Sequence, residues 1–324
     1  MTRLYVPSVL LTLSLALGAP RAAFAQPHRA VGASALAPPP YSLPWQLRPV
    51  TAGNLVRVDS TAAGFNDANG NLDLALASVL TVSYRLRGHW APMLRLGFVG
   101  NNAPGAAHDG GSFANPVVGA TYAREFGSYR LALFGATTIP VGLGGGNAPN
   151  PAAARAATAS TTARPADDAM FAVNYLTPIF GVDFAYVNHG FTAQLEVTVQ
   201  PMFRVRGDQN AAATDSFRMN AAAGLHLGCF IGSHVSLGAD LRYQRWLSHP
   251  TTPDAANGAH VPITGARMDT VTVALGLRLH FNLGGHANIH PGLSLTRGFD
   301  ARGFDAPLVT AETTAVQIDI PVFF

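Results

Sequence analysis

The stretch "FTAQLEVTVQPMFRVR", residues 191–206, is the clearest indication of the fold because apolar and polar residues alternate along it. Its odd-numbered positions, from Phe191 to Val205, are all apolar. Its even-numbered positions are mostly polar or charged, and they include Gln194, Glu196 and Gln200. Side chains alternate between the two faces of a β-strand, so a period of two indicates a strand with one apolar and one polar face.

The same alternation recurs along the chain, for instance in residues 72–86 and 269–282. It predicts an all-β protein. We expect twelve strands, at 50–62, 72–86, 92–101, 115–126, 129–140, 172–187, 191–206, 216–230, 234–247, 268–282, 287–298 and 314–324.

The connections between these strands alternate in length. Short turns such as Gly127-Ser128 and 188–190 are separated by long loops such as 141–171 and 248–267. Short periplasmic turns, long external loops and an even strand number are typical of a transmembrane antiparallel up-and-down β-barrel. The first strand, 50–62, is inferred partly from direction, because the mature chain would begin in the periplasm.

The N-terminal residues 1–25 have the pattern of a secretory signal peptide. A basic Arg3 precedes an apolar core at residues 9–17, and Ala23-Phe24-Ala25 forms a cleavage site with small residues. No later segment has 18 consecutive apolar residues, so an exported chain would enter a membrane only as strands. We therefore divide the chain into a signal peptide (1–25), a Pro-rich periplasmic lead (26–49) and an outer-membrane barrel (50–324).

Charge argues against nucleic acid as a partner. The 21 basic residues are all arginine, and removal of the signal peptide with Arg3 and Arg21 leaves 19, against 18 acidic residues. The sequence has no basic run. The single cysteine, Cys229, excludes an internal disulfide and lies too far from the cleavage site for lipid attachment there.

The longest predicted loop, 141–171, contains the Ala/Thr/Pro-rich run "NAPNPAAARAATASTTARPADD" at residues 147–168. Ala152–Ala159 is compatible with a short helix and equally with a flexible external loop.

The last nine residues, "VQIDIPVFF", resemble the C-terminal signature of bacterial outer-membrane proteins, in which a terminal aromatic follows alternating apolar residues. The resemblance implies recognition by the barrel-assembly machinery and contact with outer-membrane lipid and lipopolysaccharide. A soluble β-protein with a buried last strand is the alternative. The residues that carry the signal are Val316, Ile318, Ile320, Val322 and Phe324.

More broadly, the chain resembles the twelve-stranded outer-membrane barrels grouped with the phenol-degradation meta-pathway and related hydrophobic-compound transporters. The segments that carry this resemblance are "NPVVGATY" (115–122), "GATTIPVG" (135–142) and the terminal "IDIPVFF". It implies passage of small solutes, hydrophobic or aromatic ones among them, and it transfers no binding residue.

Strand parity predicts which polar side chains face the lumen. For Glu196, possible partners by parity are Arg95, Arg218 and Arg242, and its role is either a salt bridge that closes the lumen or a selectivity element along a solute path. The lumen-lining candidates are Arg57, Asp73, Arg95, Asp183, Gln194, Glu196, Gln200, Arg204, Arg218, Asp240, Arg242 and Arg278.

Catalytic and metal patterns are weak. The His-x-Ser pair His234–Ser236 lies at a short turn, opposite the end where outer-membrane phospholipases place theirs. His286 and His290 are four residues apart, about 13 Å on a strand, which is too far to bind one metal unless the chain bends, and with His280 they are interpreted as solvated lumen histidines. "GLGGGN" (142–147) lacks the lysine of a phosphate loop. We therefore expect no enzyme, cofactor or metal. The leading hypothesis is a channel or transporter for small solutes, and the alternative is a structural or surface-interaction barrel closed by charged side chains.

Overall fold

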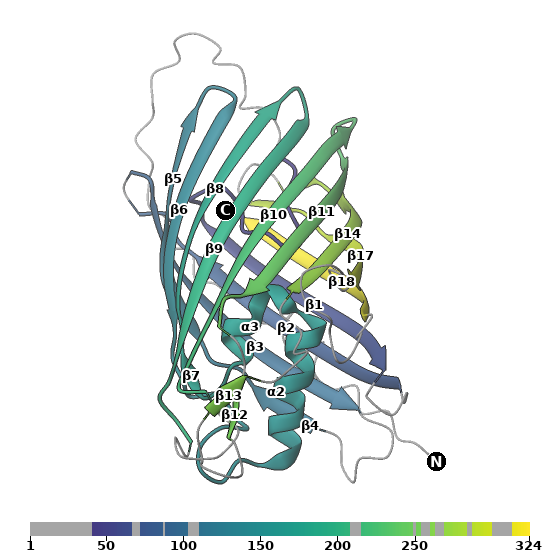
Figure 1. Ribbon diagram of the computed structural model, residues 1–324. Helices are drawn as coiled ribbons and strands as arrows, with labels where there is room; N and C mark the ends of the chain where they lie inside the picture. The colour runs from purple at the N-terminus through teal and green to yellow at the C-terminus, as the bar shows by residue number, and fades with distance from the viewer. Residues whose placement is uncertain are drawn as a thin grey trace. The chain divides into compact units, whose positions relative to one another are not determined.

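Twelve antiparallel strands form a closed barrel in the computed structural model, which describes residues 41–66, 72–86, 88–102, 110–207, 215–248, 251–253, 260–262, 269–283, 287–299 and 313–324. Pairing of the first strand with the last closes the barrel, with Leu55 opposite Phe323 (Figure 1). The barrel strands are β1 (Leu55–Asn66), β2 (Leu72–Ser83), β3 (Trp90–Asn102), β5 (Val117–Phe126), β6 (Tyr129–Thr138), β8 (Pro178–Asn188), β9 (Phe191–Arg204), β10 (Phe217–Ile231), β11 (Val235–Trp246), β14 (Asp269–Leu279), β17 (Gly292–Phe299) and β18 (Thr313–Phe323).

Short strands extend the barrel at its two ends. β4 (Gly110–Phe113) pairs with β3, and β7 (Tyr175–Leu176) pairs with β9. β12 (Thr251–Pro253) and β13 (His260–Pro262) form a separate hairpin in the loop after β11. β15 (Phe281–Leu283) and β16 (Ala287–Ile289) continue the hairpin between β14 and β17.

The expected all-β barrel with twelve strands is confirmed, and each predicted strand overlaps an observed one. One difference concerns the first strand, which begins at Leu55 rather than at residue 50. Val50 is buried instead in an apolar cluster with Ala123, Ala132 and Val187. Burial of Val50 inside the barrel therefore accounts for the later start of β1.

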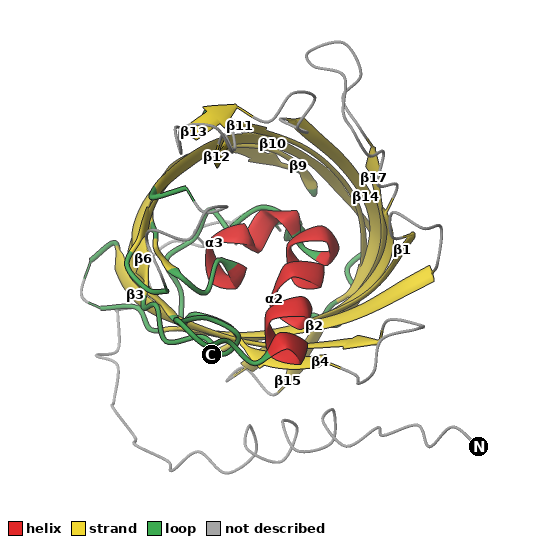
Figure 2. Ribbon diagram, turned by 60° about the horizontal axis from the view of Figure 1, so that its bottom comes forward, coloured by secondary structure: helices red, strands yellow, loops and turns green. Residues whose placement is uncertain are grey.

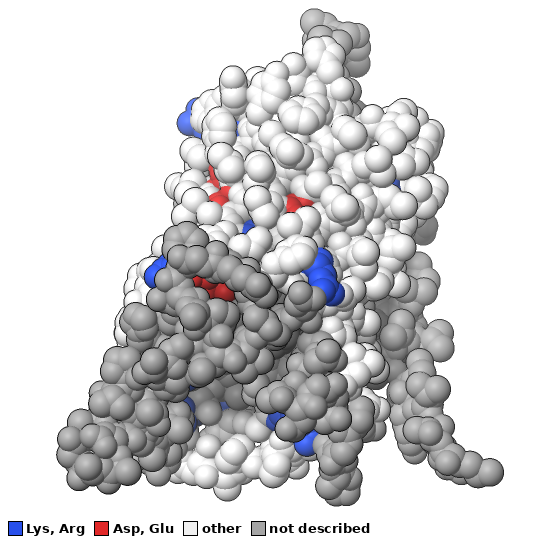
Figure 3. All heavy atoms as spheres, turned by 45° about the vertical axis from the view of Figure 1, so that its right-hand side comes forward, with Lys and Arg blue, Asp and Glu red and all other residues white. Residues whose placement is uncertain are grey.

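The apolar face of the strands points outward. On β9, Leu195 is 56% exposed and Val197 49% exposed, while Glu196 between them is only 2% exposed. An exposed aliphatic surface bounded by aromatic side chains is what a membrane barrel presents to lipid. Figure 3 shows that the described flank of the barrel is made mainly of uncharged residues. Among the described residues, no helix is long and apolar enough to cross a membrane.

In the turn between β5 and β6, Phe126 lies opposite Tyr129, and Glu125 lies opposite Arg130. Gly127 adopts a positive φ of 62°, which a residue without a Cβ accommodates without strain. Tyr129, beside this turn, stacks on Phe184 with ring centroids 5.7 Å apart.

The long connection after β6 folds into the barrel lumen. It forms the helices α2 (Pro151–Ala163), η1 (Pro165–Asp167) and α3 (Asp168–Phe171), which we call the loop insert. The Asn150 side chain caps α2 by accepting hydrogen bonds from the backbone N–H groups of Ala152 and Ala153, and proline occupies the first turn. Figure 2 shows these helices inside the ring of strands. Of the two conformations that the sequence allowed for 152–159, the helix is observed.

Small side chains let the loop insert approach the wall. Ala159 and Ala163 of α2 are buried in one cluster with Ala63, Ala75 and Ala315 of the barrel. A larger cluster joins Met170 and Phe171 of α3 to wall residues that include Phe134 and Met202. The main apolar core of the described protein therefore lies within the lumen and not between barrel and lipid.

A second segment enters the lumen from the short-turn end. Residues 41–50, which we call the N-terminal insert, directly precede β1 and contact the inner face of the strands. Residues 41–49, part of the predicted periplasmic lead (26–49), therefore lie inside the barrel. Residues 26–40 and the expected signal peptide, 1–25, are outside the described residues.

Candidate solute path in the barrel lumen

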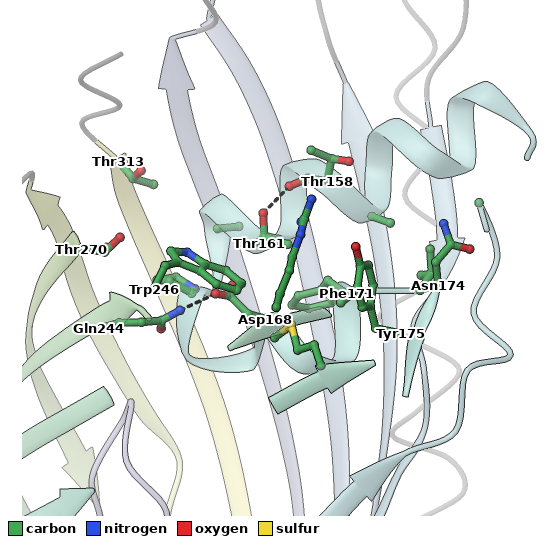
Figure 4. Close-up of a pocket in the computed structure, with 18 of the residues that line it drawn as sticks. Thr158, Thr161, Asp168, Phe171, Asn174, Tyr175, Gln244, Trp246, Thr270 and Thr313 are labelled. Carbon is green, nitrogen blue, oxygen red and sulfur yellow. Dashed lines mark hydrogen bonds between the residues drawn. The ribbon is translucent and has the colours of Figure 1, made fainter. Parts of the chain in front are cut away.

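A cavity of about 540 Å³ occupies the lumen between the loop insert and strands β10, β11, β14, β17 and β18. We call it the vestibule. One side of it is apolar, with Phe171, Tyr175, Met202 and Trp246. Figure 4 shows Phe171 and Tyr175 side by side, and Trp246 next to Asp168 and Gln244. The volume is suited to a small organic molecule.

Polar side chains complete the vestibule. Gln244 Nε2 donates to Asp168 Oδ2 over 2.5 Å and thereby ties α3 to β11 (Figure 4). Arg218 pairs with Asp215, with 3.2 Å between the guanidinium and the carboxylate. Threonine hydroxyls from the loop insert and from the wall, at Thr158, Thr161, Thr270, Thr272, Thr296 and Thr313, line the rest.

A continuous chain of buried ion pairs runs across the seam at which the barrel closes. On the wall, Arg278 of β14 makes two hydrogen bonds of 2.8 and 2.9 Å to Asp319 of β18. Arg57 of β1 also contacts Asp319 at 2.8 Å and reaches Asp59 of its own strand at 2.8 Å. Bidentate and charge-assisted bonds of this kind are the stronger class of hydrogen bond.

The chain of ion pairs continues into the loop insert. Arg164 lies 3.9 Å from Asp59 and 2.8 Å from Asp167, and Arg95 of β3 contacts Asp167 at 2.7 Å. Burial alone would raise the pKa of Asp167, but Arg95 and Arg164 lower it well below its usual range. We call Arg278, Asp319, Arg57, Asp59, Arg164, Asp167 and Arg95 the arginine–aspartate chain.

The N-terminal insert is held by carboxylates of β9 and β11. Asp240 Oδ2 accepts hydrogen bonds from the backbone N–H groups of Trp45 and Gln46, at 2.8 and 2.7 Å. Its other oxygen lies 2.6 Å from His226 Nδ1. The Trp45 ring lies under the Arg278 guanidinium, 4.2 Å from ring centroid to Cζ, so this insert also touches the arginine–aspartate chain.

Glu196 binds the same insert. Its Oε2 accepts from the backbone N–H of Arg48 at 2.6 Å, and its Oε1 lies 3.3 Å from the Arg48 guanidinium. Arg242 approaches Oε1 to 3.4 Å. Of the three arginines considered from strand parity, Arg242 is thus the observed neighbour, whereas Arg95 pairs with Asp167 and Arg218 with Asp215.

A smaller cavity of about 120 Å³ separates the two inserts. Residues 45–49 border it from one side, residues 163–167 from the other, and Arg57 and Arg95 lie in its wall. Ala163, Pro165 and Thr296 border both the vestibule and this cavity. The two inserts therefore both lie in the lumen, on opposite sides of the smaller cavity.

Most of the predicted lumen residues lie on the inner face. The buried ones are Arg57, Asp183, Gln194, Glu196, Gln200, Asp240, Arg242 and Arg278. Arg95, Arg204 and Arg218 are partly buried. Asp73 lies opposite Phe65 in the β1–β2 register, and its side chain is outside the described part of the protein.

The structure groups these candidates into three sets. Arg57 and Arg278 meet at Asp319, in the arginine–aspartate chain. Gln194 bridges Asp183 and the backbone carbonyl of Arg48, beside Glu196. The third set is at the vestibule, where the guanidinium groups of Arg204 and Arg218 lie 5.9 and 5.4 Å from the centre of the Tyr175 ring.

Sequence reasoning missed several residues of these networks. Asp319 belongs to the terminal segment that was predicted to be an assembly signal. Its odd-numbered position places it on the face opposite the apolar one, and this parity could have identified it as a lumen residue. Arg164 and Asp167 lie in a loop, where no strand parity indicates direction. Trp45 belongs to the Pro-rich lead, in which nothing pointed to the lumen.

The histidines at the short-turn end form a small cluster. His280 Nδ1 and His290 Nδ1 are 2.7 Å apart, and His280 Nε2 lies 2.8 Å from Ser236 Oγ. A hydroxyl beside an imidazole is one requirement of a serine nucleophile, but Ser236 is only 2% exposed, which leaves a substrate no access. Within the described residues, no group of three or more His, Cys, Asp or Glu side chains is arranged to hold a metal; His286 is outside them.

Comparisons with known proteins agree with the architecture. No family model matches the chain, and no curated protein matches its sequence. The COG4313 outer membrane channel from Pseudomonas putida F1 is similar in structure, with a TM-score of 0.52, 11% sequence identity, and coverage of 87% of this chain and 97% of that chain.

Two further solved structures are more distant. They are the NanC porin (TM-score 0.45, 10% identity, 82% of this chain and 98% of that chain) and the Pseudomonas putida toluene transporter TodX (TM-score 0.38, 10% identity, 86% and 90%). At such identities the likeness to the COG4313 channel concerns the fold alone. Together with the closed barrel and its apolar outer face, it confirms the expected architecture: the chain has the fold of the bacterial outer-membrane β-barrel proteins.

Proposed function

We propose that this protein is an outer-membrane channel that passes small solutes through a lumen closed at rest by its two inserts. The observation that carries the proposal is the vestibule of about 540 Å³, which lies inside the barrel with the loop insert on one side and wall strands on the other. A barrel of this size leaves a narrow path once its lumen is vacated.

The contacts that hold the inserts favour reversible movement. The N-terminal insert is held largely by hydrogen bonds and ion pairs, such as those of Asp240 and Glu196. The loop insert contacts the wall through alanines, through Met170 and Phe171, and through Arg164 and Asp167. A hydrogen bond exchanged for one to water costs only about 0.5–1.5 kcal/mol net, so water entering the lumen compensates part of the loss when an insert moves.

A second candidate function is a structural or surface-interaction barrel whose lumen stays closed. The arginine–aspartate chain favours it, because it links β1, β3, β14, β18 and the loop insert through buried contacts of 2.7–3.9 Å. Removing one member of a buried pair is costly, which makes such a chain a firm closure. Under this reading the loops at the vestibule end would serve a partner.

Single-channel recording in planar bilayers separates the two functions. A channel gives discrete openings with the wild-type protein and none with protein-free detergent. A variant in which residues 147–168 are replaced by a short Gly-Ser loop should then be open for a larger fraction of the recording. Wild-type protein that is folded by heat-modifiability on gels, yet never opens, supports the closed barrel and contradicts the channel.

We further propose that the last strand is read by the barrel-assembly machinery and that no catalysis takes place in the barrel. Val316, Ile318 and Phe324 face outward, 44%, 54% and 57% exposed, where a partner or lipid can contact them. Deleting Phe323-Phe324 should then lower the folded amount in the membrane far more than deleting Ala152–Ala159. Equal folded amounts for the two deletions would exclude the terminal strand as the signal.

A further inference from the structure

The smaller cavity, between the two inserts, is bordered by an excess of positive charge. Among the described residues that border it, the carboxylates are Asp59 and Asp167, and the arginines are Arg48 of the N-terminal insert, Arg57 of β1, Arg95 of β3 and Arg164 of the loop insert. The side chains of Arg48, Arg95 and Arg164 are 19%, 13% and 9% exposed, so each keeps some surface that the protein does not cover. A small molecule inside the cavity can therefore contact them.

The carboxylates that pair with these arginines are too few to balance them. In the described ion pairs at and around the cavity, more guanidinium groups than carboxylates take part. The guanidinium groups are those of Arg48, Arg57, Arg95, Arg164, Arg242 and Arg278, and the carboxylates are those of Asp59, Asp167, Asp319 and Glu196. A buried charge without a partner is costly, so this excess favours a further negative group close to the arginines.

Two other buried carboxylates of the lumen, Asp183 and Asp240, lie outside the border of this cavity. Asp183 accepts a hydrogen bond from Gln194. Asp240 contacts His226 and accepts from the backbone N–H groups of Trp45 and Gln46. Both carboxylates are thus engaged elsewhere, and the guanidinium surface that faces the cavity has no carboxylate of the described chain in front of it.

The unmatched polar atoms at the cavity point to the same sign of charge. Of the described residues that border it, Arg48 and Gln46 each have a buried side-chain atom without a hydrogen-bond partner, Nε and Nε2 respectively. Both atoms are N–H donors, and none of the unmatched buried acceptors belongs to a described residue at this border. These two atoms are covered, so they add to the positive potential and leave direct contact to the exposed guanidinium surface. Water in the cavity would accept hydrogen bonds but would bring no negative charge.

We propose that the smaller cavity binds one small inorganic oxyanion of the phosphate or sulfate type, held by Arg48, Arg95 and Arg164. A guanidinium group matches an oxyanion because its N–H groups can donate to two oxygens at once. The volume of about 120 Å³ equals that of about four water molecules, which suits a tetrahedral oxyanion and excludes larger organic acids. Since Arg48 belongs to one insert and Arg164 to the other, the bound anion would tie the two inserts together. The site goes beyond the proposed function, because an open and a closed barrel can both hold it.

The test is equilibrium dialysis of the detergent-solubilised, full-length mature protein with radiolabelled inorganic phosphate, at an ionic strength held constant with chloride. We expect saturable binding of about one phosphate per barrel, as the single cavity implies. Unlabelled sulfate should displace it. Citrate should compete at least about tenfold less well than sulfate, because a ligand that overfills the cavity must push packed side chains aside.

Variants assign the binding to this cavity. Arg48→Met removes one of the contacting cations while Glu196 keeps Arg242 as its partner, and it should weaken phosphate binding at least about tenfold. Arg218→Met is the matched control, because Arg218 also pairs with a carboxylate in the lumen but borders the vestibule and not the smaller cavity. Gln46→Glu keeps the shape of the side chain and adds a negative charge at the border, so it should abolish phosphate binding. This variant also serves if Arg48→Met does not fold, as judged by heat-modifiability.

Four results would overturn the proposal. They are the absence of saturable phosphate binding, competition by citrate as strong as that by sulfate, an equal loss of binding in Arg218→Met, and wild-type binding in a folded Arg48→Met or Gln46→Glu variant. Binding in micelles does not depend on passage. Phosphate binding by a protein that never conducts would refute the channel and leave the site intact, whereas openings without phosphate binding would do the reverse.

Discussion

Arg95 of β3 and Asp167 of the loop insert form an ion pair of 2.7 Å, and Asp167 is shared with Arg164 at 2.8 Å. Asp167 is thus the carboxylate through which the barrel wall and the insert are joined at this point. Because it neutralises two buried guanidinium groups at once, the closed state depends on its charge.

Asp167→Asn should release the loop insert without unfolding the barrel. Breaking a buried ion pair by removing one partner costs about 3–5 kcal/mol, and movement of residues 151–171 relieves that cost while the strands remain paired. We expect faster proteolysis within 151–171 and an unchanged heat-modifiable band. Glu125→Gln is the control, since Glu125 pairs with Arg130 over 3.8 Å and is 57% exposed, so its loss costs at most about 1 kcal/mol. Equal protease resistance of wild type and Asp167→Asn would contradict the role of Asp167.

A side chain at residue 276 should displace the N-terminal insert. A Cβ at Gly276 would lie 2.6 Å from two atoms of the Trp45 ring and 2.7 Å from the Leu293 carbonyl oxygen. Gly276→Leu is therefore expected to cost about 1–3 kcal/mol and to move the tryptophan into water, seen as a red shift of fluorescence. Gly135→Leu is the control, because a Cβ there meets nothing within 4 Å. An unshifted spectrum for Gly276→Leu would argue against Trp45 in the lumen.

The barrel should gain stability as the pH rises from about 4 to 6.5. Burial and the nearby Arg278 lower the pKa of both His280 and His290 from 6.5 to about 4, and His290 adds to the effect on His280. The unfolded chain therefore binds more protons than the folded one between these values, so stability increases with pH in this window and falls as the pH decreases. The midpoint of thermal unfolding, measured from pH 4 to 7, should show this slope, and His290→Asn should flatten it. An identical slope in the variant would exclude the pair as its source.

Surface labelling of intact cells tests the direction of the chain. In a Cys229→Ser background, Ala148→Cys lies in an exposed part of the long connection and should react with an impermeant maleimide. Ser128→Cys, in the short turn between β5 and β6, should react only after the outer membrane is opened. The reverse pattern would invert the barrel.

The barrel was predictable from the sequence because it follows from one local rule. Alternation in segments such as 191–206 assigns both the strand and its outward face, and Leu195 and Glu196 lie where that rule places them. Residue Glu196 also shows the limit of the rule. Parity pointed Arg95, Arg218 and Arg242 into the same lumen, but the choice among them depends on register and loop positions.

The inserts were not predictable for a different reason. Trp45 and Asp167 lie in segments without periodicity, and their positions depend on long-range contacts with Asp240 and Arg95. The helix in 151–163 has a local cause in the cap formed by Asn150, yet its place inside the barrel depends on alanine packing against the wall. The vestibule forms only because these segments fold into the barrel, so no sequence pattern predicted it.

Movement of the loop insert should open a path through the lumen. Locking that insert reversibly tests this movement. Ala75 of β2 and Ala159 of α2 share one buried cluster, so cysteines at both positions in a Cys229→Ser background should form a disulfide. Single-channel recordings should show no openings when the pair is oxidised and wild-type openings after reduction, with each single-cysteine variant insensitive to both treatments. Openings that persist unchanged in the fully oxidised double variant would contradict the account.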